Sequence, residues 1–156
     1  MSVELVTHKT LAFPQPRDAV WAAMSDVGSY QTWWPWLRSF TAHALATGEQ
    51  WHCTVRPPLP YTVNFTIAFA EVVVAERVRA HVSGDIAGDA DLQLSDDCGG
   101  CRVVVRSDLA PVSGFLKILS TTLPPVARYG HDWILSTGAL QFEKRALSAG
   151  ARDTTT

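Results

Sequence analysis

The chain has 156 residues, of which 47% are hydrophobic and 18% charged, and its formal net charge is -2. This composition favours one globular domain with its own core and excludes a disordered chain. The balanced charge excludes the strongly basic surface typical of nucleic-acid binding, and no apolar run is long enough to predict a membrane span.

The first part of the chain predicts one strand and two short helices. Residues 3–13 are rich in β-forming residues. Pro16 is typical of a helix start, and apolar residues recur on one face of a short helix within residues 14–26. Residues 27–36 predict a second helix that Pro35 ends, because proline lacks an N–H donor and disfavours a helical residue before it.

The middle of the chain predicts six further strands. Short connections with turn signals separate them, which favours antiparallel hairpins over parallel crossovers. The sequence GDIAG, residues 84–88, predicts a tight turn that requires glycine. The predicted strands span residues 38–47, 50–56, 61–73, 77–84, 90–96 and 101–109.

The last part of the chain changes to a helical period from about Pro111. This pattern predicts one long helix, which Pro124 and Pro125 would break. A strand, two helices, six strands and a long helix together predict an α+β fold with an antiparallel sheet. The apolar helical positions are Leu116, Leu119, Leu123, Val126, Trp133, Thr137 and Leu140.

Strand alternation predicts that one face of the sheet is apolar and the other is in water. We expect that a strongly bent sheet of about seven strands with one helix across it cannot fill its own middle. The aromatic residues of the apolar face are therefore candidates for the lining of a pocket. The apolar phase comprises Trp51, Cys53, Val55, Tyr61, Val63, Phe65, Ile67, Phe69, Leu92, Leu94, Cys101, Val103, Val105, Ser107 and Leu109.

The cysteines and the N-terminus bear on the compartment and on metal binding. Three cysteines leave at least one unpaired, which fits a reducing compartment, and the N-terminus has no signal-peptide pattern, so we expect a cytoplasmic protein. Cys98 and Cys101 have the spacing of a redox motif or half a zinc site, but no second cysteine pair follows. The next residues alternate like a strand, which favours a hairpin turn at Gly99–Gly100 and predicts no metal.

The order of elements and several motifs resemble a known superfamily. The motifs are FPQPRDAVWAAMSDVGSYQTWWP at residues 13–35, GDIAG at 84–88, and YGHDW at 129–133 with Gly138 after it. Over residues 3–147 the chain resembles the START-like, birch-allergen-like helix-grip superfamily (SRPBCC), in its bacterial polyketide cyclase/dehydrase-like branch. The opening motif and element order are fairly specific to the fold, and no motif is specific to a reaction.

The resemblance implies a cavity. In this superfamily the bent sheet grips the C-terminal helix and leaves space for a lipid, sterol, polyketide or other apolar molecule. It implies one helix-grip domain at residues 1–147 and a flexible tail at 148–156. It also implies that at least one of Trp33, Trp34 and Trp36 faces the cavity mouth while another fills the core. The alternative, in which all three only close the end of the sheet, stays open.

His131 is the strongest candidate for proton transfer, because histidine exchanges protons near neutral pH. It belongs to a helical stripe with Leu135, Gly138 and Phe142, opposite the stripe that contains Gly130 and Trp133. Sequence leaves open which stripe meets a ligand. A structural histidine is the favoured alternative.

Other polar groups are weaker candidates. Tyr61 and Tyr129 could donate a hydrogen bond to a carbonyl, as an enolising cyclase would require. Asp85, Arg106 and Asp108 fall on the wet face. The predicted ligand-binding residues are Trp33, Trp36, Trp51, Cys53, Tyr61, Phe65, Phe69, Ser107 and Trp133.

The function we favour from sequence is binding of a small hydrophobic, aromatic or polyketide-like molecule. The alternative is a polyketide cyclase, aromatase or dehydratase that uses His131 as acid or base, with Tyr61 or Tyr129 as hydrogen-bond donor. We expect no cofactor, no metal and no nucleotide in either case, since the sequence contains none of the corresponding motifs.

Overall fold

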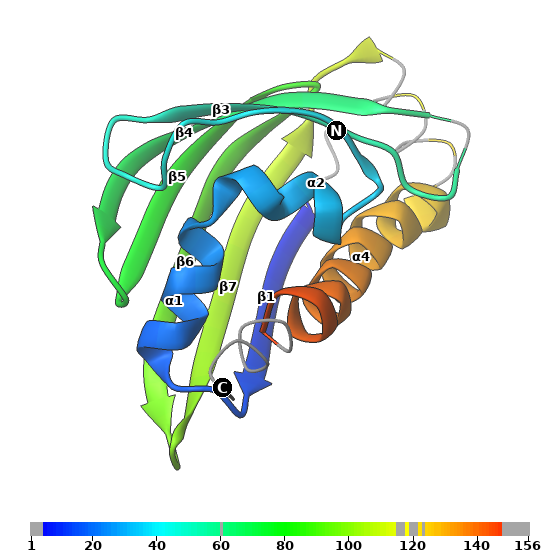
Figure 1. Ribbon diagram of the computed structural model, residues 1–156. Helices are drawn as coiled ribbons and strands as arrows, with labels where there is room; N and C mark the ends of the chain where they lie inside the picture. The colour runs from blue at the N-terminus through cyan, green and yellow to red at the C-terminus, as the bar shows by residue number, and fades with distance from the viewer. Residues whose placement is uncertain (1–4, 60, 115–117, 119–121, 123, 148–156) are drawn as a thin grey trace.

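Figure 1 shows a computed structural model of the protein, which describes residues 5–59, 61–114, 118, 122 and 124–147. A seven-stranded antiparallel sheet curls around the long helix α4 (Pro124–Gln141). Two short helices, α1 (Arg17–Ser25) and α2 (Tyr30–Trp33), lie on the same side of the sheet as α4. This arrangement confirms the predicted α+β helix-grip fold.

The strands follow the chain in simple hairpins. The order across the sheet is β1-β7-β6-β5-β4-β3-β2, so only β1 pairs with a strand that is distant in sequence. The strands are β1 (Leu5–Phe13), β2 (Leu37–Thr41), β3 (Gln50–Val55), β4 (Val63–Val73), β5 (Arg77–Gly84), β6 (Ile86–Asp97) and β7 (Gly100–Pro111).

Two helical segments, η1 and η2, were not expected. A 3-10 turn, η1 (Val27–Ser29), precedes α2, whereas α2 ends at Trp33 as predicted, because Trp34 directly before Pro35 is not helical. A π-helical segment, η2 (Phe142–Leu147), follows α4. The structure describes α4 from Pro124 to Gln141, and Thr122 is helical as well, so the predicted break at Pro124 and Pro125 stays a prediction. The predicted tail at 148–156 and the helical positions Leu116, Leu119 and Leu123 lie outside the described residues.

The strand registers confirm the predicted apolar phase of the sheet. Cys53 pairs with Phe65 between β3 and β4, and Leu92 pairs with Val105 between β6 and β7. The register of β4 with β5 shifts between Phe69 and Glu71. This bulge turns Glu71 outward although it lies two residues after inward Phe69, which explains why the alternation in the sequence ends there.

The end of one strand and the start of another were predicted imperfectly. Strand β2 ends at Thr41 rather than at residue 47, whereas β6 begins at Ile86 rather than at residue 90. The GDIAG turn therefore contains fewer residues than expected. Gly88 lies within β6, with φ of 152°, and a Cβ there would come within 1.9 Å of the backbone oxygen of Asp108. Glycine is required at this position because the strand β7 approaches it closely.

The CGGC segment forms a hairpin turn, but one residue earlier than predicted. Gly100 already pairs with Asp97, so the turn residues are Cys98 and Gly99, with φ of 50° and 86°. Two consecutive positive φ angles match the twist of the flanking strands. Cys98 is exposed and Cys101 is buried, and both are free thiols.

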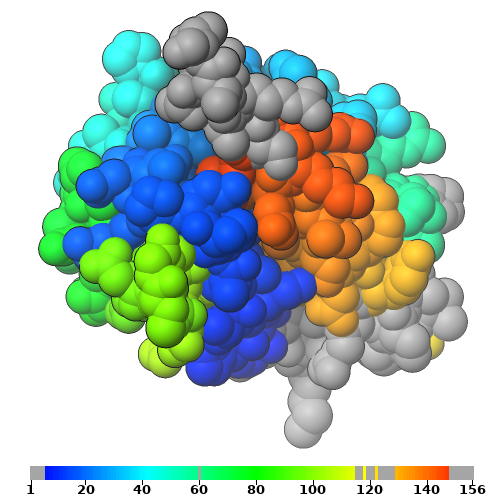
Figure 2. Space-filling view, turned by 60° about the horizontal axis from the view of Figure 1, so that its bottom comes forward, coloured from blue at the N-terminus to red at the C-terminus, as the bar shows by residue number. Residues whose placement is uncertain are grey.

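Helix α1 packs against η2 and against the hairpin of β6 and β7. Figure 2 shows α1 in blue beside the orange end of α4 and the yellow-green β6–β7 hairpin. Arg17 lies 3.6 Å from the Asp96 carboxylate in that hairpin. Phe13 packs edge-on against Phe142, with ring centroids 5.7 Å apart. These contacts close one end of the space between the sheet and α4.

No helix among the described residues combines the length and apolar character needed to cross a membrane.

Candidate functional site

An internal cavity of about 510 Å³ lies between the concave face of the sheet and α4. Residues from all seven strands line it, together with residues of α1 and α4 and the segment around α2. Most of its wall is aliphatic or aromatic. The residues that α4 contributes are Gly130, His131, Ile134, Leu135, Gly138 and Ala139.

The cavity decides which stripe of the C-terminal helix faces inward. His131, Leu135, Gly138 and Phe142 all line the cavity. Leu140, from the competing stripe, is 56% exposed. Gly130 is the member of the competing stripe that also reaches the cavity, because it directly precedes His131 on the helix.

Two glycines of α4 let aromatic side chains approach the helix. A Cβ at Gly130 would lie 2.2 Å from the Tyr61 hydroxyl, and a Cβ at Gly138 would lie 3.2 Å from the Trp36 ring. The Trp34 Nε1–H also donates to the Gly138 carbonyl at 2.9 Å. The glycines thus bring the helix against the connection before β4 and against the segment after α2.

The three clustered tryptophans have different roles. Trp33 is only 6% exposed, and its ring packs against Tyr30, Trp34 and Phe142. It belongs to the core and not to the cavity wall. Trp34 and Trp36 line the cavity and stack on each other, with ring centroids 5.4 Å apart.

The indole N–H groups of the cavity wall are already bonded within the protein. Trp34 donates to Gly138, Trp36 donates to the Gln141 side chain at 2.9 Å, and Trp51 donates to the Ala44 carbonyl at 2.9 Å. The three indoles therefore offer ring faces and edges to a ligand rather than hydrogen bonds.

Three predicted site residues lie elsewhere. Trp33 is in the core, as described above. Trp133 is half-buried on a side of α4 that does not reach the cavity, and Tyr129 is 54% exposed. The helical rotation of about 100° per residue separates both from His131 and explains their placement. The remaining predicted residues line the cavity: Trp36, Trp51, Cys53, Tyr61, Phe65, Phe69, Ser107 and His131.

The predicted ligand-binding residues did not include Tyr30, or Trp34, which was named only as one of three tryptophans that could face the cavity. Tyr30 lines the cavity, is 7% exposed, and has ring contacts with Trp33, Trp34, Phe40 and Trp51. Its hydroxyl donates to the Met24 carbonyl, and burial raises its pKa. The spacing of four between Tyr30 and Trp34 places them on one helical face and was the available signal.

His131 is an enclosed imidazole. Its side chain is 18% exposed, and Nδ1 lies 3.8 Å from the Asp132 carboxylate. Burial lowers the pKa of His131, and the Asp132 charge opposes this effect in part. His131 is therefore neutral at pH 7 and can accept or donate a proton at one ring nitrogen.

The lowered pKa of His131 predicts a pH dependence of stability. Below the unfolded-state value of 6.5, the unfolded chain binds a proton more readily than the folded one. Stability should therefore fall as pH drops from about 6.5 through the folded pKa. Urea unfolding of the wild type and His131→Gln at pH values from about 5 to 8 measures this component. The variant retains the other four histidines, and an identical pH dependence in both proteins would contradict the expectation.

Three other polar groups of the wall, on Cys53, Tyr61 and Ser107, are uncharged at pH 7. Burial raises the pKa of the Cys53 thiol to about 12, so it is protonated and is a poor nucleophile. Burial also raises the pKa of the Tyr61 phenol. Ser107 faces the cavity from β7. Within the described parts of the chain, no three His, Cys, Asp or Glu side chains are grouped to hold a metal.

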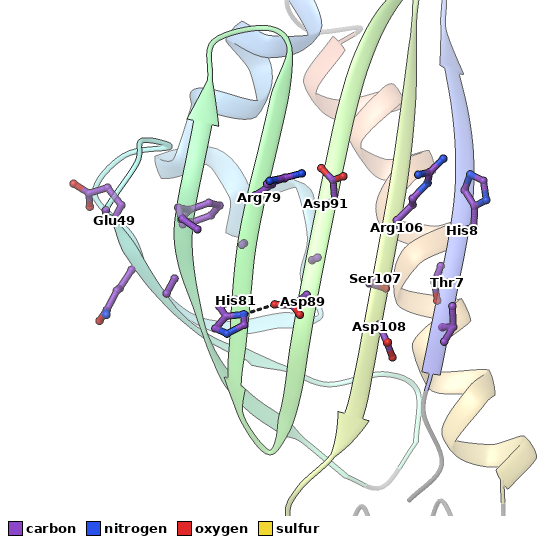
Figure 3. Close-up of a pocket in the computed structure, with 18 residues that line it drawn as sticks. Thr7, His8, Glu49, Arg79, His81, Asp89, Asp91, Arg106, Ser107 and Asp108 are labelled. Carbon is purple, nitrogen blue, oxygen red and sulfur yellow. Dashed lines mark ion pairs between the residues drawn. The ribbon is translucent and has the colours of Figure 1, made fainter.

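A second, larger hollow of about 930 Å³ lies on the outer face of the sheet. Figure 3 looks onto this face, with α4 behind the sheet. Its lining contains four acidic side chains and two arginines, and the paired His81 and Asp89 are each 75% exposed. Charged side chains in water hold a small molecule weakly, so we consider the apolar cavity between the sheet and α4 the functional site.

Comparisons with known proteins agree with this architecture. By sequence, the chain matches no protein-family model and no curated protein. By structure, it is similar to TTHA0849 from Thermus thermophilus, with a TM-score of 0.75 and 15% identity, covering 94% of this chain and 99% of that chain.

Two further structures share the fold. The Zhui aromatase/cyclase from Streptomyces sp. R1128 has a TM-score of 0.69 and 14% identity, covering 96% of this chain and 95% of that chain. A START superfamily protein from Mycobacterium smegmatis has a TM-score of 0.67 and 16% identity, covering 92% and 98%. Identities this low establish the fold and leave the activity open. The protein thus has the helix-grip fold that these structures share.

Proposed function

We propose that this protein binds a small, mostly apolar molecule in the cavity between the sheet and α4. The main support for this proposal is the volume of that cavity. Protein interiors are close-packed, with few voids larger than a water molecule. A space of about 510 Å³ between the sheet and α4 falls within the range of ligand pockets, and its wall is mostly apolar.

The aromatic part of the wall favours a flat or ring-containing ligand. Trp34, Trp36, Tyr30 and Trp51 border the same space. Their N–H and O–H groups are bonded to the protein, so ring faces remain for contact. Offset or edge-on packing of rings stabilises such a complex beyond the burial of area. An aromatic or polycyclic molecule therefore fits better than a flexible polar one.

The similar structures support a small-molecule function without identifying the ligand. One neighbour is an aromatase/cyclase and another a START superfamily protein. The fold serves enzymes and other proteins alike, so the site has to decide between binding and catalysis.

Native mass spectrometry of the freshly purified protein tests the proposal. We expect a discrete mass above that of the 17.1 kDa chain, which disappears on denaturation and yields an extractable small molecule. If no mass is retained, the apo protein should still take up aromatic compounds from a panel and change its tryptophan fluorescence. Absence of both signals would contradict the proposal.

A second candidate, an acid/base enzyme of the polyketide cyclase kind, is favoured by one observation. His131 lines the cavity as a neutral imidazole, and the Tyr61 hydroxyl approaches Gly130, its neighbour on α4. In this candidate His131 moves a proton and Tyr61 holds a carbonyl oxygen. The same spectra distinguish it, because an enzyme releases a molecule chemically different from the one that was added.

A further inference from the structure

The charged residues of this protein are kept out of the cavity wall. Among the described residues that line it, none is a lysine, arginine or glutamate, and the ionisable ones besides Tyr and Cys are His131 and Asp91. This absence matters because an ion inside an apolar wall needs a partner of opposite charge or several hydrogen bonds.

Asp91 borders the cavity, but its carboxylate belongs to the outer face. In the strand register, Asp91 of β6 lies opposite Arg79 of β5 and Arg106 of β7. Figure 3 shows the three side chains together on the outer face, and Asp91 also lies 3.6 Å from the Arg77 guanidinium. The next residue, Leu92, points into the cavity with Val105, as strand alternation requires.

The two arginines beside Asp91 lie on the outer side of the sheet, where they cannot meet a ligand in the cavity. Arg79 and Arg106 share the outer row with Asp91 and His8. Within the cavity, His131 is neutral at pH 7, and the indole N–H groups are already bonded. The faces of the aromatic rings carry partial negative charge, which disfavours an anion further.

From this arrangement we infer that the cavity selects uncharged ligands over anionic ones such as carboxylates, sulfonates and phosphates. The inference rests on the proposed binding function and narrows it to a chemical class. A neutral molecule leaves no ion unpaired in the cavity. A free fatty acid or a phosphorylated compound would have to leave its anionic group in water or lose its charge.

Two naphthylamine dyes provide a matched pair for the test. N-phenyl-1-naphthylamine is neutral, and 1-anilinonaphthalene-8-sulfonate has the same rings with a sulfonate added. Fluorescence titrations at pH 7.5 would use protein freed of any co-purified molecule. Val105→Trp, which places an indole inside the cavity, identifies the part of each signal that comes from inside it. We expect the neutral dye to bind inside at least tenfold more tightly than the sulfonate.

Each outcome has a separate meaning. Equal or tighter binding of the sulfonate inside the cavity would overturn the inference while leaving the binding function intact. If neither dye gives a signal that Val105→Trp removes, the proposed function fails and the inference fails with it. Sulfonate binding that persists unchanged in Val105→Trp comes from the protein surface, and then tight cavity binding of the neutral dye supports the inference.

Discussion

Trp33→Ala should destabilise the fold by about 3–5 kcal/mol, the usual loss when a large aromatic residue is removed from a core. Trp33 is 6% exposed, and its ring lies 5.3 Å from Tyr30, 5.8 Å from Trp34 and 5.6 Å from Phe142 between ring centroids. The Trp33 carbonyl also accepts a hydrogen bond from Arg145 at 2.6 Å. This ring connects α2 to η2, so its removal leaves a cavity between them. Urea unfolding measures the loss.

Trp36→Ala is the matched control for this prediction. Trp36 is half-buried, and part of its surface already borders the cavity rather than packed atoms. Its removal should destabilise the fold less than Trp33→Ala and should weaken ligand binding more. The prediction would be contradicted if Trp36→Ala destabilised the fold more than Trp33→Ala, or if Trp33→Ala weakened ligand binding more than Trp36→Ala.

Val105→Trp should weaken ligand binding at least tenfold while the protein stays folded. Val105 lines the cavity from β7, opposite Leu92, and is only half-buried because its side chain borders the empty space. An indole placed there occupies volume that a ligand needs. Because the added atoms enter a cavity rather than a packed core, the destabilisation should stay below the ~1–3 kcal/mol typical of overpacking. Dye titration and thermal unfolding measure the two quantities.

Val104→Trp provides the control on the same strand. Val104 pairs with Thr10 and Gln93, and its side chain points to the outer face, away from the cavity. Both variants replace a valine of β7 by tryptophan, so they differ only in the face of the sheet on which the indole is placed. Ligand affinity should be unchanged in Val104→Trp. Equal weakening by both variants would mean that binding does not take place in the cavity.

The element order and the inward phase of the sheet were predictable because both follow from local rules. Side chains alternate along a strand, so the apolar positions of residues 61–69 identified the inner face before any pairing was known. Prolines and glycines marked the ends of most elements. Trp51, Cys53, Phe65 and Ser107 were placed on the cavity side for this reason.

The end of β2, the start of β6 and the turn at Cys98 were shifted because pairing with neighbouring strands extends or shortens an element beyond its own propensity. The bulge after Phe69 likewise depends on the register with β5. Such features involve contacts between residues far apart along the chain, which a local pattern does not contain.

By itself, the sequence determined an α+β fold with one apolar sheet face, a helix across it and a tryptophan-rich segment beside it. Only the tertiary structure decided which face of α4 meets the cavity, because both of its stripes are largely apolar and the choice depends on where Gly130 and Gly138 admit Tyr61 and Trp36. It also placed Trp33 in the core and Trp34 in the wall. The physical reason is that burial against distant segments sets the position of a side chain, whereas local sequence sets only its direction from the backbone.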